Sequence, residues 1–542
     1  MPASKPKLTG LRYWMERVLE ECDHVATDFS ADPVHDLRVA LRRCRSMADG
    51  LRAIDPDPDW KAMKKAGKRL FQRLGNLRDV QIMMEWIERL HPAQAHTETP
   101  SPGSTEAAPA LPEDLPANGR NRNSAALSLE PAPAYDSQEP VAFALLDILR
   151  SREREHKREA QAALEEFDRK QWRHWSQSLP LRAARFRLGS SLFKHLALER
   201  WTEARQLHAR ALRNRSQVAF HSLRIGIKRF RYIVENFLPQ QHKAWSRDLK
   251  EIQDLLGEVH DLDVLWKTAA SCHVFHEINS RNRWHARILQ ERSKRIEAYR
   301  ARMMGAESLW SVWRTALPQG TQIQAIATQR LKLWAKALDP DFAHSEHVTR
   351  LALELYDSLA ANRFLGSANG ADARSTLYLA SLLHDVGKSK KKNGHHKASF
   401  ELIHAHAAPL GWKTEDVQRA AVIARFQHGA LPTKNHNLLR DLLPRERKST
   451  IQLAAILRLA NALDANHDGR IRRVQVEQQA KRSRHDAQPN CIVIAAEGYS
   501  RLSAVARSAA AERYLLETVL HRPVLVKPMK TPVQTSKAIR GQ

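Results

Sequence analysis

A short basic sequence occurs twice in this chain, and this repeat limits what the chain can fold into. HDLRVALRRCR at 35–45 recurs as HSLRIGIKRFR at 221–231. Each copy is followed at nearly the same distance by a second shared sequence, LFQRLGNLRD at 70–79 and IQDLLGEVHD at 252–261. A small difference in loop length accounts for the change in spacing. The repeat therefore predicts two helical units of like design, arranged in tandem.

Each copy is amphipathic when it is placed on a helix. The basic side chains recur at i, i+3, i+7 and i+10 and share one face: His35, Arg38, Arg42 and Arg45 in the first copy, and His221, Arg224, Lys228 and Arg231 in the second. The opposite face is apolar: Leu37, Leu41, Cys44 and Ala48 in one copy, and Leu223, Ile227, Phe230 and Val234 in the other. Like charges this close repel one another, so the basic face favours a bound anion. A solvated surface, or pairing with acids on a neighbouring helix, is the alternative.

Further basic residues follow on a helix predicted over 61–73. Lys65 and Lys68 crowd one side of it, and Lys250 is the counterpart of Lys68 in the second unit. Guanidinium groups bind two phosphate oxygens at once, while lysines act as mobile point charges. The whole chain is basic too, with 87 Lys and Arg against 60 Asp and Glu and a net charge of +27. Such an excess attracts polyanions: nucleic acid, an anionic membrane or polyphosphate.

The rest of the chain divides by composition. The proline-rich segment 96–140 cannot bury enough apolar surface to order itself, and we predict disorder there. Helical patterns flank it, so the two halves of the repeat cover 8–95 and 141–318, followed by a domain at 325–528 and a basic tail at 529–542. Strand-like sequences appear only near 491–496 and 523–527. The predicted class is mostly α, with a small β element near the C-terminus.

Two sequence features indicate the compartment. The four cysteines are far apart and form no CxxC pair, which argues against a disulfide framework or a zinc ribbon and indicates a reducing compartment. Neither a signal peptide nor an uninterrupted apolar stretch of about 18 residues is recognisable. We therefore expect a cytoplasmic protein with no membrane partner.

A second group of motifs, rich in histidine, lies between 344 and 470. HSEHVTRLA begins at His344, LLHDVGK contains the adjacent His384 and Asp385, HHKAS begins at His395, FQHG contains His428, and RLANALD ends the series. Adjacent His and Asp side chains, joined by His and Asp from other helices, form a compact set of nitrogen and oxygen donors. Such a set suits a divalent metal ion, which activates water for phosphoester cleavage.

The N-terminal repeat resembles the CHAD family, the conserved histidine α-helical domain, over about residues 10–300. The resemblance implies a pair of pseudosymmetric helical bundles whose basic and histidine side chains bind inorganic polyphosphate. The residues that match the family's motifs, and that the resemblance implies as polyphosphate ligands, are His35, Arg38, Arg42, Arg45, Lys65, Lys68, His221, Arg224, Lys228, Arg231 and Lys250. The position of Arg78 is taken by His260 in the second copy, which departs from the pattern.

The C-terminal motifs resemble the HD superfamily of metal-dependent phosphohydrolases. Together with the sequence at 495–526, they resemble more narrowly the all-helical HD-type domain that ends the exopolyphosphatase/guanosine pentaphosphatase family. The resemblance implies Mn²⁺, Mg²⁺ or a similar ion, with Lys388 and His428 as catalytic residues. The implied metal ligands are His344, His384, Asp385, Asn461 and Asp464. Asn461 stands where the family has Asp, and Asp464 is its nearest substitute.

These features together favour a polyphosphate-binding protein of the cytoplasm, located at polyphosphate granules, with an HD-type domain that acts as a metal-dependent phosphohydrolase. The alternatives are a catalytically inactive granule scaffold and a hydrolase of nucleotides or other phosphoesters. No actin-like exopolyphosphatase domain, with its glycine-rich phosphate loops, is recognisable. Nucleic acid is the weaker candidate ligand, because neither stacking aromatics nor a groove-reading helix is evident.

Overall fold

The computed structural model describes residues 10–91, 140–365, 371–391, 393–433, 436–440, 442–477 and 491–529. The predicted disordered insert lies outside the described residues, apart from its last residue, and so does the basic tail, apart from its first. Within the described part, no helix combines the length and the apolar character that crossing a bilayer requires.

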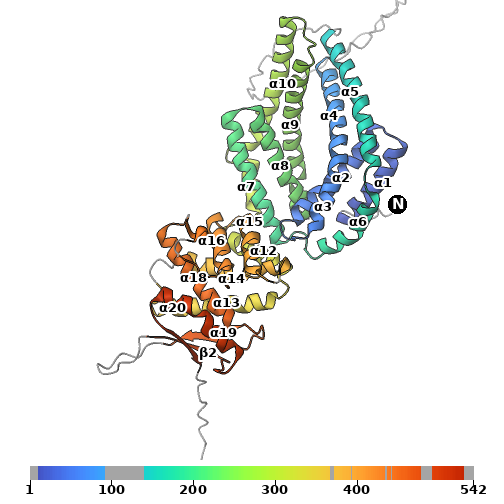
Figure 1. The fold of residues 1–542 in the computed structure, drawn as a ribbon. Helices are drawn as coiled ribbons and strands as arrows, with labels where there is room; N and C mark the ends of the chain where they lie inside the picture. Colours follow the sequence, from blue (N-terminus) through green and yellow to red (C-terminus); the bar gives the residue numbers. More distant parts are fainter. Residues whose placement is uncertain are drawn as a thin grey trace, which may run out of the picture.

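The first half of the N-terminal module is an all-helical bundle (Figure 1). Its helices are α1 (Leu11–Thr27), α2 (Ala31–Leu51), α3 (Pro58–Ala66), α4 (Lys68–Leu90), α5 (Pro140–Glu165) and α6 (Arg169–Ala183). Local sequence sets the start of α3, where Pro58 occupies the first turn and the Asp57 carboxylate accepts a hydrogen bond from the Asp59 N–H at 2.9 Å. Helices α4 and α5 pack side by side, and α6 packs against α1, although the segment 92–139 separates them in the chain. The predicted boundary between the halves, which gave residues 141–318 to the second half, is therefore corrected: α5 and α6, up to residue 183, belong to the first half.

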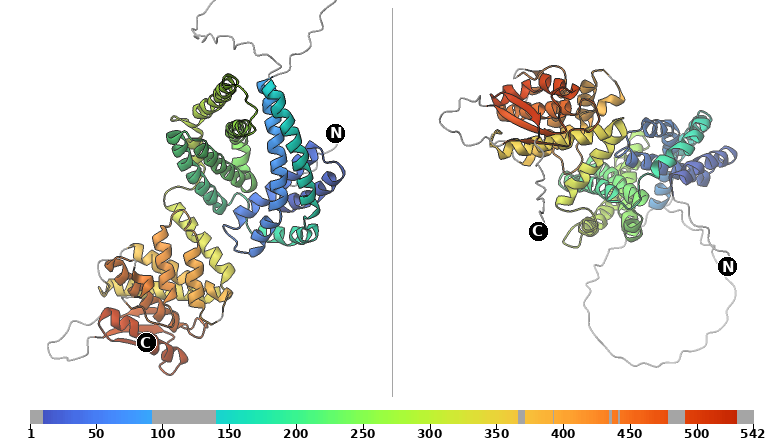
Figure 2. Two further views of the ribbon diagram at one scale, coloured as in Figure 1. Left: turned by 45° about the horizontal axis from the view of Figure 1, so that its top comes forward. Right: turned by 90° about the horizontal axis from the view of Figure 1, so that it is seen from below.

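The second half repeats the design with longer helices. They are α7 (Ser191–Asn214), α8 (Gln217–Phe237), α9 (Pro239–Ser271), α10 (Ile278–Met303) and α11 (Leu309–Thr315). The duplicated sequences lie on α2 and α8, and on α4 and α9. Figures 1 and 2 show the two halves side by side, and both pairs of repeated helices are in contact, α2 with α8 and α4 with α9. The predicted tandem of helical units is therefore confirmed.

The apolar faces of the two repeated helices form the core of this module. All eight apolar residues predicted for these faces, on α2 and on α8, are fully buried. One continuous apolar cluster includes residues of both halves. The basic faces therefore lie opposite the core, as the helical spacing predicts.

Polar contacts and one close approach join α2 to α8. Arg43 forms an ion pair with Glu235, and the Asn236 side chain donates a hydrogen bond to the Ser46 hydroxyl at 2.8 Å. Gly50 lies directly under the Phe237 ring, which stacks on Phe193 with ring centroids 4.3 Å apart. A side chain at position 50 has no room, so glycine permits the two helices to meet.

The C-terminal domain is helical with one small sheet. Its helices are α12 (Thr321–Leu338), α13 (Phe342–Ala361), α14 (Ala371–Leu383), the 3₁₀ turn η1 (Val386–Ser389), α15 (His395–Ala405), α16 (Thr414–Arg425), α17 (Asn437–Arg440), α18 (Pro444–Leu463), α19 (Ala504–Glu512) and α20 (Tyr514–Leu520). Its strands are β1 (Arg473–Val476), β2 (Ile492–Glu497) and β3 (Val524–Pro528). Strand β2 is central, antiparallel to β1 and parallel to β3. The predicted class, mostly α with a small C-terminal β element, is confirmed.

A buried guanidinium group joins the C-terminal domain to both halves of the N-terminal module. Arg330 on α12 forms an ion pair with Glu199 on α7 at 2.7 Å and donates to the His195 Nδ1 at 2.9 Å. It also donates to the Ala53 carbonyl, just after α2, at 3.3 Å. His195 Nε2 in turn donates to the Leu410 carbonyl at 2.7 Å. One side chain thus contacts three parts of the fold.

The Gly50 contact predicts opposite effects for the same substitution at two helical glycines. Gly50→Ala should lower the free energy of unfolding by about 1–3 kcal/mol, because the new methyl group collides with a ring that is itself packed. Gly257→Ala, in α9 with no atom within 4 Å of the added carbon, should raise it by about 0.5–1 kcal/mol through helix propensity. Chemical denaturation measures both. Equal effects at the two positions would contradict the proposed close approach.

Candidate functional site

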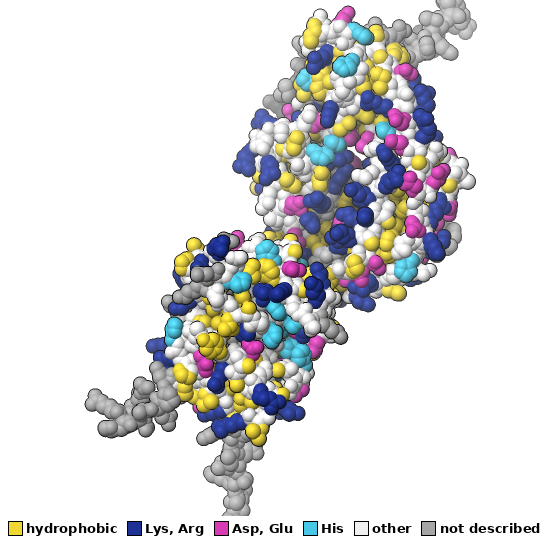
Figure 3. Space-filling model, in the orientation of Figure 1, with side chains coloured by type: hydrophobic (Ala, Val, Ile, Leu, Met, Phe, Trp, Pro, Cys, Tyr) yellow, Lys and Arg dark blue, Asp and Glu magenta, His cyan; other side chains and the backbone are white. Residues whose placement is uncertain are grey.

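A cavity of about 390 Å³ lies between the two halves of the N-terminal module, where α2 faces α8. Five of the predicted ligands line it: Arg38, Arg42, Arg45, Arg224 and Lys228. Figure 3 shows Lys and Arg side chains gathered in the hollow between the two bundles. We call this cavity, together with its basic side chains, the basic groove.

Four of these cations take no part in a direct ion pair. Arg38, Arg42, Arg224 and Lys228 form no ion pair within 4.0 Å with any residue that the structure describes. The Nε atoms of Arg42 and Arg224 are buried and have no hydrogen-bond partner there. Buried donors normally have an acceptor, so these side chains are suited to bind an anion.

Aromatic rings and backbone carbonyls hold the arginines of α2 in place. Arg38 and Arg45 lie over the Phe71 ring, with guanidinium carbons 5.8 and 5.1 Å from its centroid, and Arg42 lies over Tyr232 at 5.9 Å. Arg38 also donates to the Gly75 carbonyl at 3.4 Å, and Arg45 to that of Lys64 at 2.5 Å. These contacts position positive charge without neutralising it.

Burial and the crowding of positive charge lower the pKa values of basic side chains in the groove. Burial, with Arg224, Arg42 and Arg38 close by, lowers the pKa of Lys228 to about 7. Burial also lowers the pKa of Arg38, and the positive charges of Arg42, Arg78 and Arg224 act in the same direction. The groove therefore favours bound negative charge.

The other predicted ligands of this group lie outside the cavity. His35, Lys65 and Lys68 are exposed on α2, α3 and α4, respectively. Lys250 is paired with Asp254 at 2.7 Å, and Arg231 lies 3.9 Å from Glu235. Their role in binding stays a prediction.

Residues not predicted as ligands complete the lining of the groove. Lys64 and Arg229 line it, and so does His260, whose Nδ1 lies 3.2 Å from that of His221. Burial and the adjacent Arg224 lower the His260 pKa to about 4. The sequence signals were the lysine cluster that includes Lys64, the place of Arg229 within the repeated motif, and the departure from the repeat at position 260.

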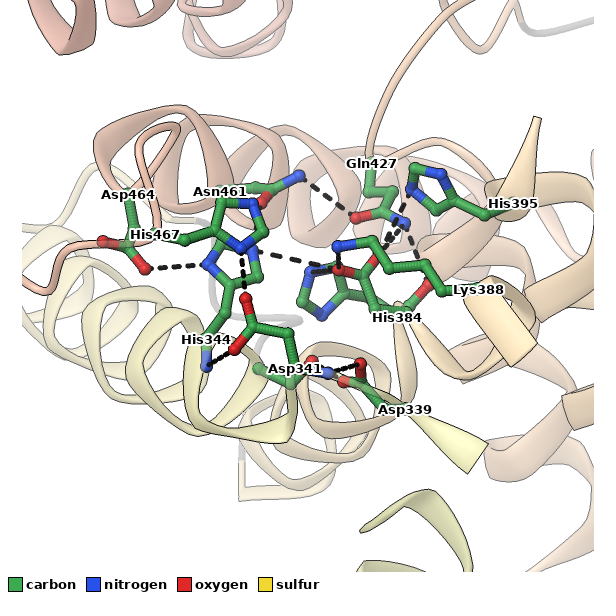
Figure 4. Close-up of polar contacts among 12 residues, drawn as sticks. Asp339, Asp341, His344, His384, Lys388, His395, Gln427, Asn461, Asp464 and His467 are labelled. Carbon is green, nitrogen blue, oxygen red and sulfur yellow. Dashed lines mark hydrogen bonds and ion pairs between the residues drawn. The ribbon is translucent and has the colours of Figure 1, made fainter. Parts of the chain in front are cut away.

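In the C-terminal domain, three of the predicted metal ligands come together. His344 lies on α13, and His384 and Asp385 follow one another at the end of α14. Each offers one ligand atom, and these atoms all lie within 4.8 Å of one another (Figure 4). All three side chains are buried. Two imidazoles and a carboxylate form a donor set that suits a divalent transition metal.

Hydrogen bonds orient both histidines toward this centre. His344 Nδ1 donates to the Asp464 carboxylate at 2.7 Å, and His384 Nδ1 donates to the Ser381 carbonyl at 2.7 Å. The Nε2 atom of each ring is then the one that carries a lone pair. His384 Nε2 is buried and has no hydrogen-bond partner in the described part of the chain. Burial lowers the His384 pKa, which keeps the ring neutral, as a metal ligand must be.

Asn461 presents an oxygen to the same centre. Its side-chain NH₂ donates to Gln427 Oε1 at 3.2 Å, and the Gln427 amide donates to Asp385 Oδ1 at 3.2 Å. This chain turns the Asn461 Oδ1 toward His344 Nε2, 3.0 Å away. Two lone pairs facing one another are stabilised by a cation between them, so Asn461 fits as a neutral fourth ligand.

Asp464 does not share this face. It is the C-terminal cap of α18, where the helix ends, and its two oxygens accept hydrogen bonds from His344 Nδ1 and from the Gly469 N–H at 3.0 Å. Asp464 therefore orients His344 through its Nδ1 atom. The prediction that Asp464 replaces the missing Asp ligand does not fit this geometry. The three-residue spacing suggested otherwise because it assumed that the helix continues.

Lys388 and His395 contact Asp385 on its other side. Burial alone would raise the pKa of Asp385, but His384, His395 and Lys388 hold it well below its usual range. Lys388 Nζ lies 2.5 Å from one carboxylate oxygen, and His395 Nε2 lies 3.2 Å from the other. Lys388 and His428, the predicted catalytic residues, line a cavity of about 230 Å³ beside the donor set. The sequence motifs contained His395 and Gln427 but gave them no role.

Two protein-family models match this chain in separate ranges. Residues 10–270 match the CHAD domain, and residues 328–494 match domain III of the Ppx/GppA phosphatases. No curated protein matches the chain. The predicted pairing of a CHAD domain with an exopolyphosphatase-type C-terminal domain is therefore confirmed.

The donor set predicts graded effects on metal affinity. His384→Ala should abolish stoichiometric Mn²⁺ binding, and Asp464→Ala should weaken it about 10–100-fold because His344 loses its orienting acceptor. Asn461→Asp should strengthen binding by adding a negative charge. Calorimetric titration with Mn²⁺ measures each constant, and His404→Ala, an exposed histidine of α15, is the control. Binding that persists unchanged in His384→Ala would place the ion elsewhere.

Proposed function

With a CHAD domain at 10–270 and a Ppx/GppA-type domain at 328–494 as the premise, we propose that this protein binds inorganic polyphosphate in the basic groove. The observation that carries the proposal is the set of four cations, Arg38, Arg42, Arg224 and Lys228, that lack ion pairs within 4.0 Å among the described residues. A chain of phosphates supplies closely spaced negative charge to both walls at once. The protein would then gather at polyphosphate granules in the cytoplasm.

The groove suits polyphosphate better than nucleic acid. Its aromatic rings, Phe71 and Tyr232, lie against guanidinium groups, so their faces are not offered to bases for stacking. The walls come from repeated helices, which present like charges from either side. Polyphosphate is a repeating polymer without chemical direction, and a pseudosymmetric site can hold it in both orientations.

Removing one cation from each wall tests the proposal. Arg42→Ala with Arg224→Ala should weaken polyphosphate binding by about 30-fold or more, since truncating partners of a charge-assisted contact costs about 2 kcal/mol or more. The salt dependence of binding should become shallower. Arg69→Ala with Arg374→Ala, two paired arginines outside the groove, removes the same charge and serves as the control. Equal losses in the two double variants would show that net charge alone attracts the polymer.

The orphaned His384 Nε2 beside Asp385 favours a second candidate activity, metal-dependent phosphoester hydrolysis. A divalent ion bound there would supply Lewis-acid activation of water. His344, His384, Asp385 and Asn461 would hold the ion, while Lys388 offers a positive charge to a phosphoryl oxygen at the edge of the cavity. Polyphosphate, nucleotides and other phosphoesters are the candidate substrates.

The Lys388→Gln variant tests metal binding and phosphoester turnover separately. The variant should keep Mn²⁺ affinity, because Lys388 competes with the ion for Asp385, but turnover of a model phosphoester should fall about 10²-fold or more through the lost charge. His384→Ala should lose both metal and turnover. Stoichiometric Mn²⁺ without turnover of polyphosphate, nucleotides or model phosphoesters in the unchanged protein would favour the inactive scaffold.

A further inference from the structure

Among the carboxylates that lie near the cations of the basic groove, two occupy equivalent positions of the repeat. Asp79 ends the repeated motif on α4, and Asp261 ends it on α9. Asp79 lines the cavity of the basic groove, and Asp261 lines an adjoining cavity of about 280 Å³. Both cavities are bordered by Arg224 and Lys228. Both acids therefore lie near the cations that the two cavities share.

Neither acid is tied to a cation by a direct contact. Asp79 and Asp261 form no ion pair within 4.0 Å with any described residue. Burial raises the pKa of Asp79, and it raises that of Asp261 to about 6, with the Asp79 charge acting in the same direction. Arg224 and Lys228 lower both values without overcoming burial. The carboxylates thus act on the groove at longer range, as fixed negative charges that face any bound phosphate.

These charges weaken the attraction for every phosphate that enters. The cost of immobilising a ligand arises once per molecule, whereas attraction is summed over all phosphates in contact. If the carboxylates reduce the binding free energy gained per phosphate, a single phosphate ion no longer gains enough to bind. A chain that reaches both walls gains the sum of many contacts and still binds. The carboxylates set a threshold in chain length.

We propose that Asp79 and Asp261 are the specificity-determining residues of the groove, which set the minimum length of polyphosphate that it binds. The inference rests on the proposed polyphosphate function. It assigns the two acids a role in rejecting orthophosphate and short oligophosphates, which are chemically identical to segments of the long polymer.

Lowering the pH should change phosphate binding in the same direction as replacing the two acids. The charged groups that act most strongly on the two carboxylates are Arg38 on α2, Arg78 on α4, Arg224 and Lys228 on α8, and Glu258 on α9. The other charged and titratable residues that line the two cavities are Arg42, Arg45, Asp49, Lys64, Glu85, Arg89, Arg229, Asp254 and His260. As the pH falls from above 7 to below 6, Lys228 gains a positive charge and Asp261 loses a negative one. Both changes strengthen anion binding, so shorter chains should bind at the lower pH.

Titration calorimetry with orthophosphate, tripolyphosphate and long-chain polyphosphate tests the proposal above pH 7. The unchanged protein should bind only the long chain. Asp79→Asn with Asp261→Asn should bind tripolyphosphate and should bind the long chain at least about tenfold more tightly, which corresponds to 1.4 kcal/mol. Each single variant should give an intermediate gain. Asp23→Asn with Asp248→Asn, two paired acids away from the groove, removes the same charge and should change nothing.

Three outcomes would overturn the inference. In the first, the double Asn variant binds tripolyphosphate no better than the unchanged protein. In the second, it binds the long chain more weakly. In the third, Mg²⁺ strengthens binding by the unchanged protein but not by the variant, which would make the acids ligands of a bridging cation. If neither protein binds the long chain, the proposed function itself has failed. The single variants keep the test valid if the double variant does not fold, as followed by circular dichroism.

Discussion

The contact between α2 and α8 is the constraint on which the N-terminal module depends. It brings two helices with basic faces together, so the apolar faces can share one core only if the repulsion between the basic faces is tolerated. The Arg43–Glu235 pair, the Asn236 hydrogen bond and the absence of a side chain at Gly50 hold the helices close. The burial of large apolar side chains supplies the stabilisation that offsets the charge. The groove is thus the region of this helical fold where like charges lie close together and repel one another.

The donor set of the C-terminal domain combines a low negative charge with a well-defined geometry. The exchange of a carboxylate for the Asn461 amide removes one negative charge, and Lys388 and His395 already surround the remaining carboxylate. The amide network through Gln427 nevertheless keeps an oxygen directed at His344. The centre therefore combines two imidazoles, one carboxylate and one neutral amide oxygen, which is a donor set of low negative charge.

The fold could be predicted largely from periodicity. Leu37, Leu41 and their counterparts on α8 recur at helical spacing, and burial follows directly from that spacing. The C-terminal strands were predicted near 491–496 and 523–527 and lie at 492–497 and 524–528, whereas β1 was not predicted, because four residues, RVQV, are too few to give a clear periodic pattern.

The sites were less predictable because they depend on how helices face one another. Lys64 and His260 enter the groove only through the packing of α3 and α9 against the repeated helices. The place of Asp464 depends on the end of α18, which spacing alone does not reveal. The motif residues His344, His384 and Asp385 were predicted together because each sits within its own recognisable sequence.

Arg330 makes the junction between the two domains selective. Its guanidinium is shared by Glu199, by His195 and by the carbonyl that follows α2, so each part of the fold contributes to its burial. Another helical partner that covered Arg330 would have to supply equivalent acceptors, because a guanidinium buried without them costs several kcal/mol. The junction is therefore a selective polar contact, which limits the surfaces on which this domain can dock.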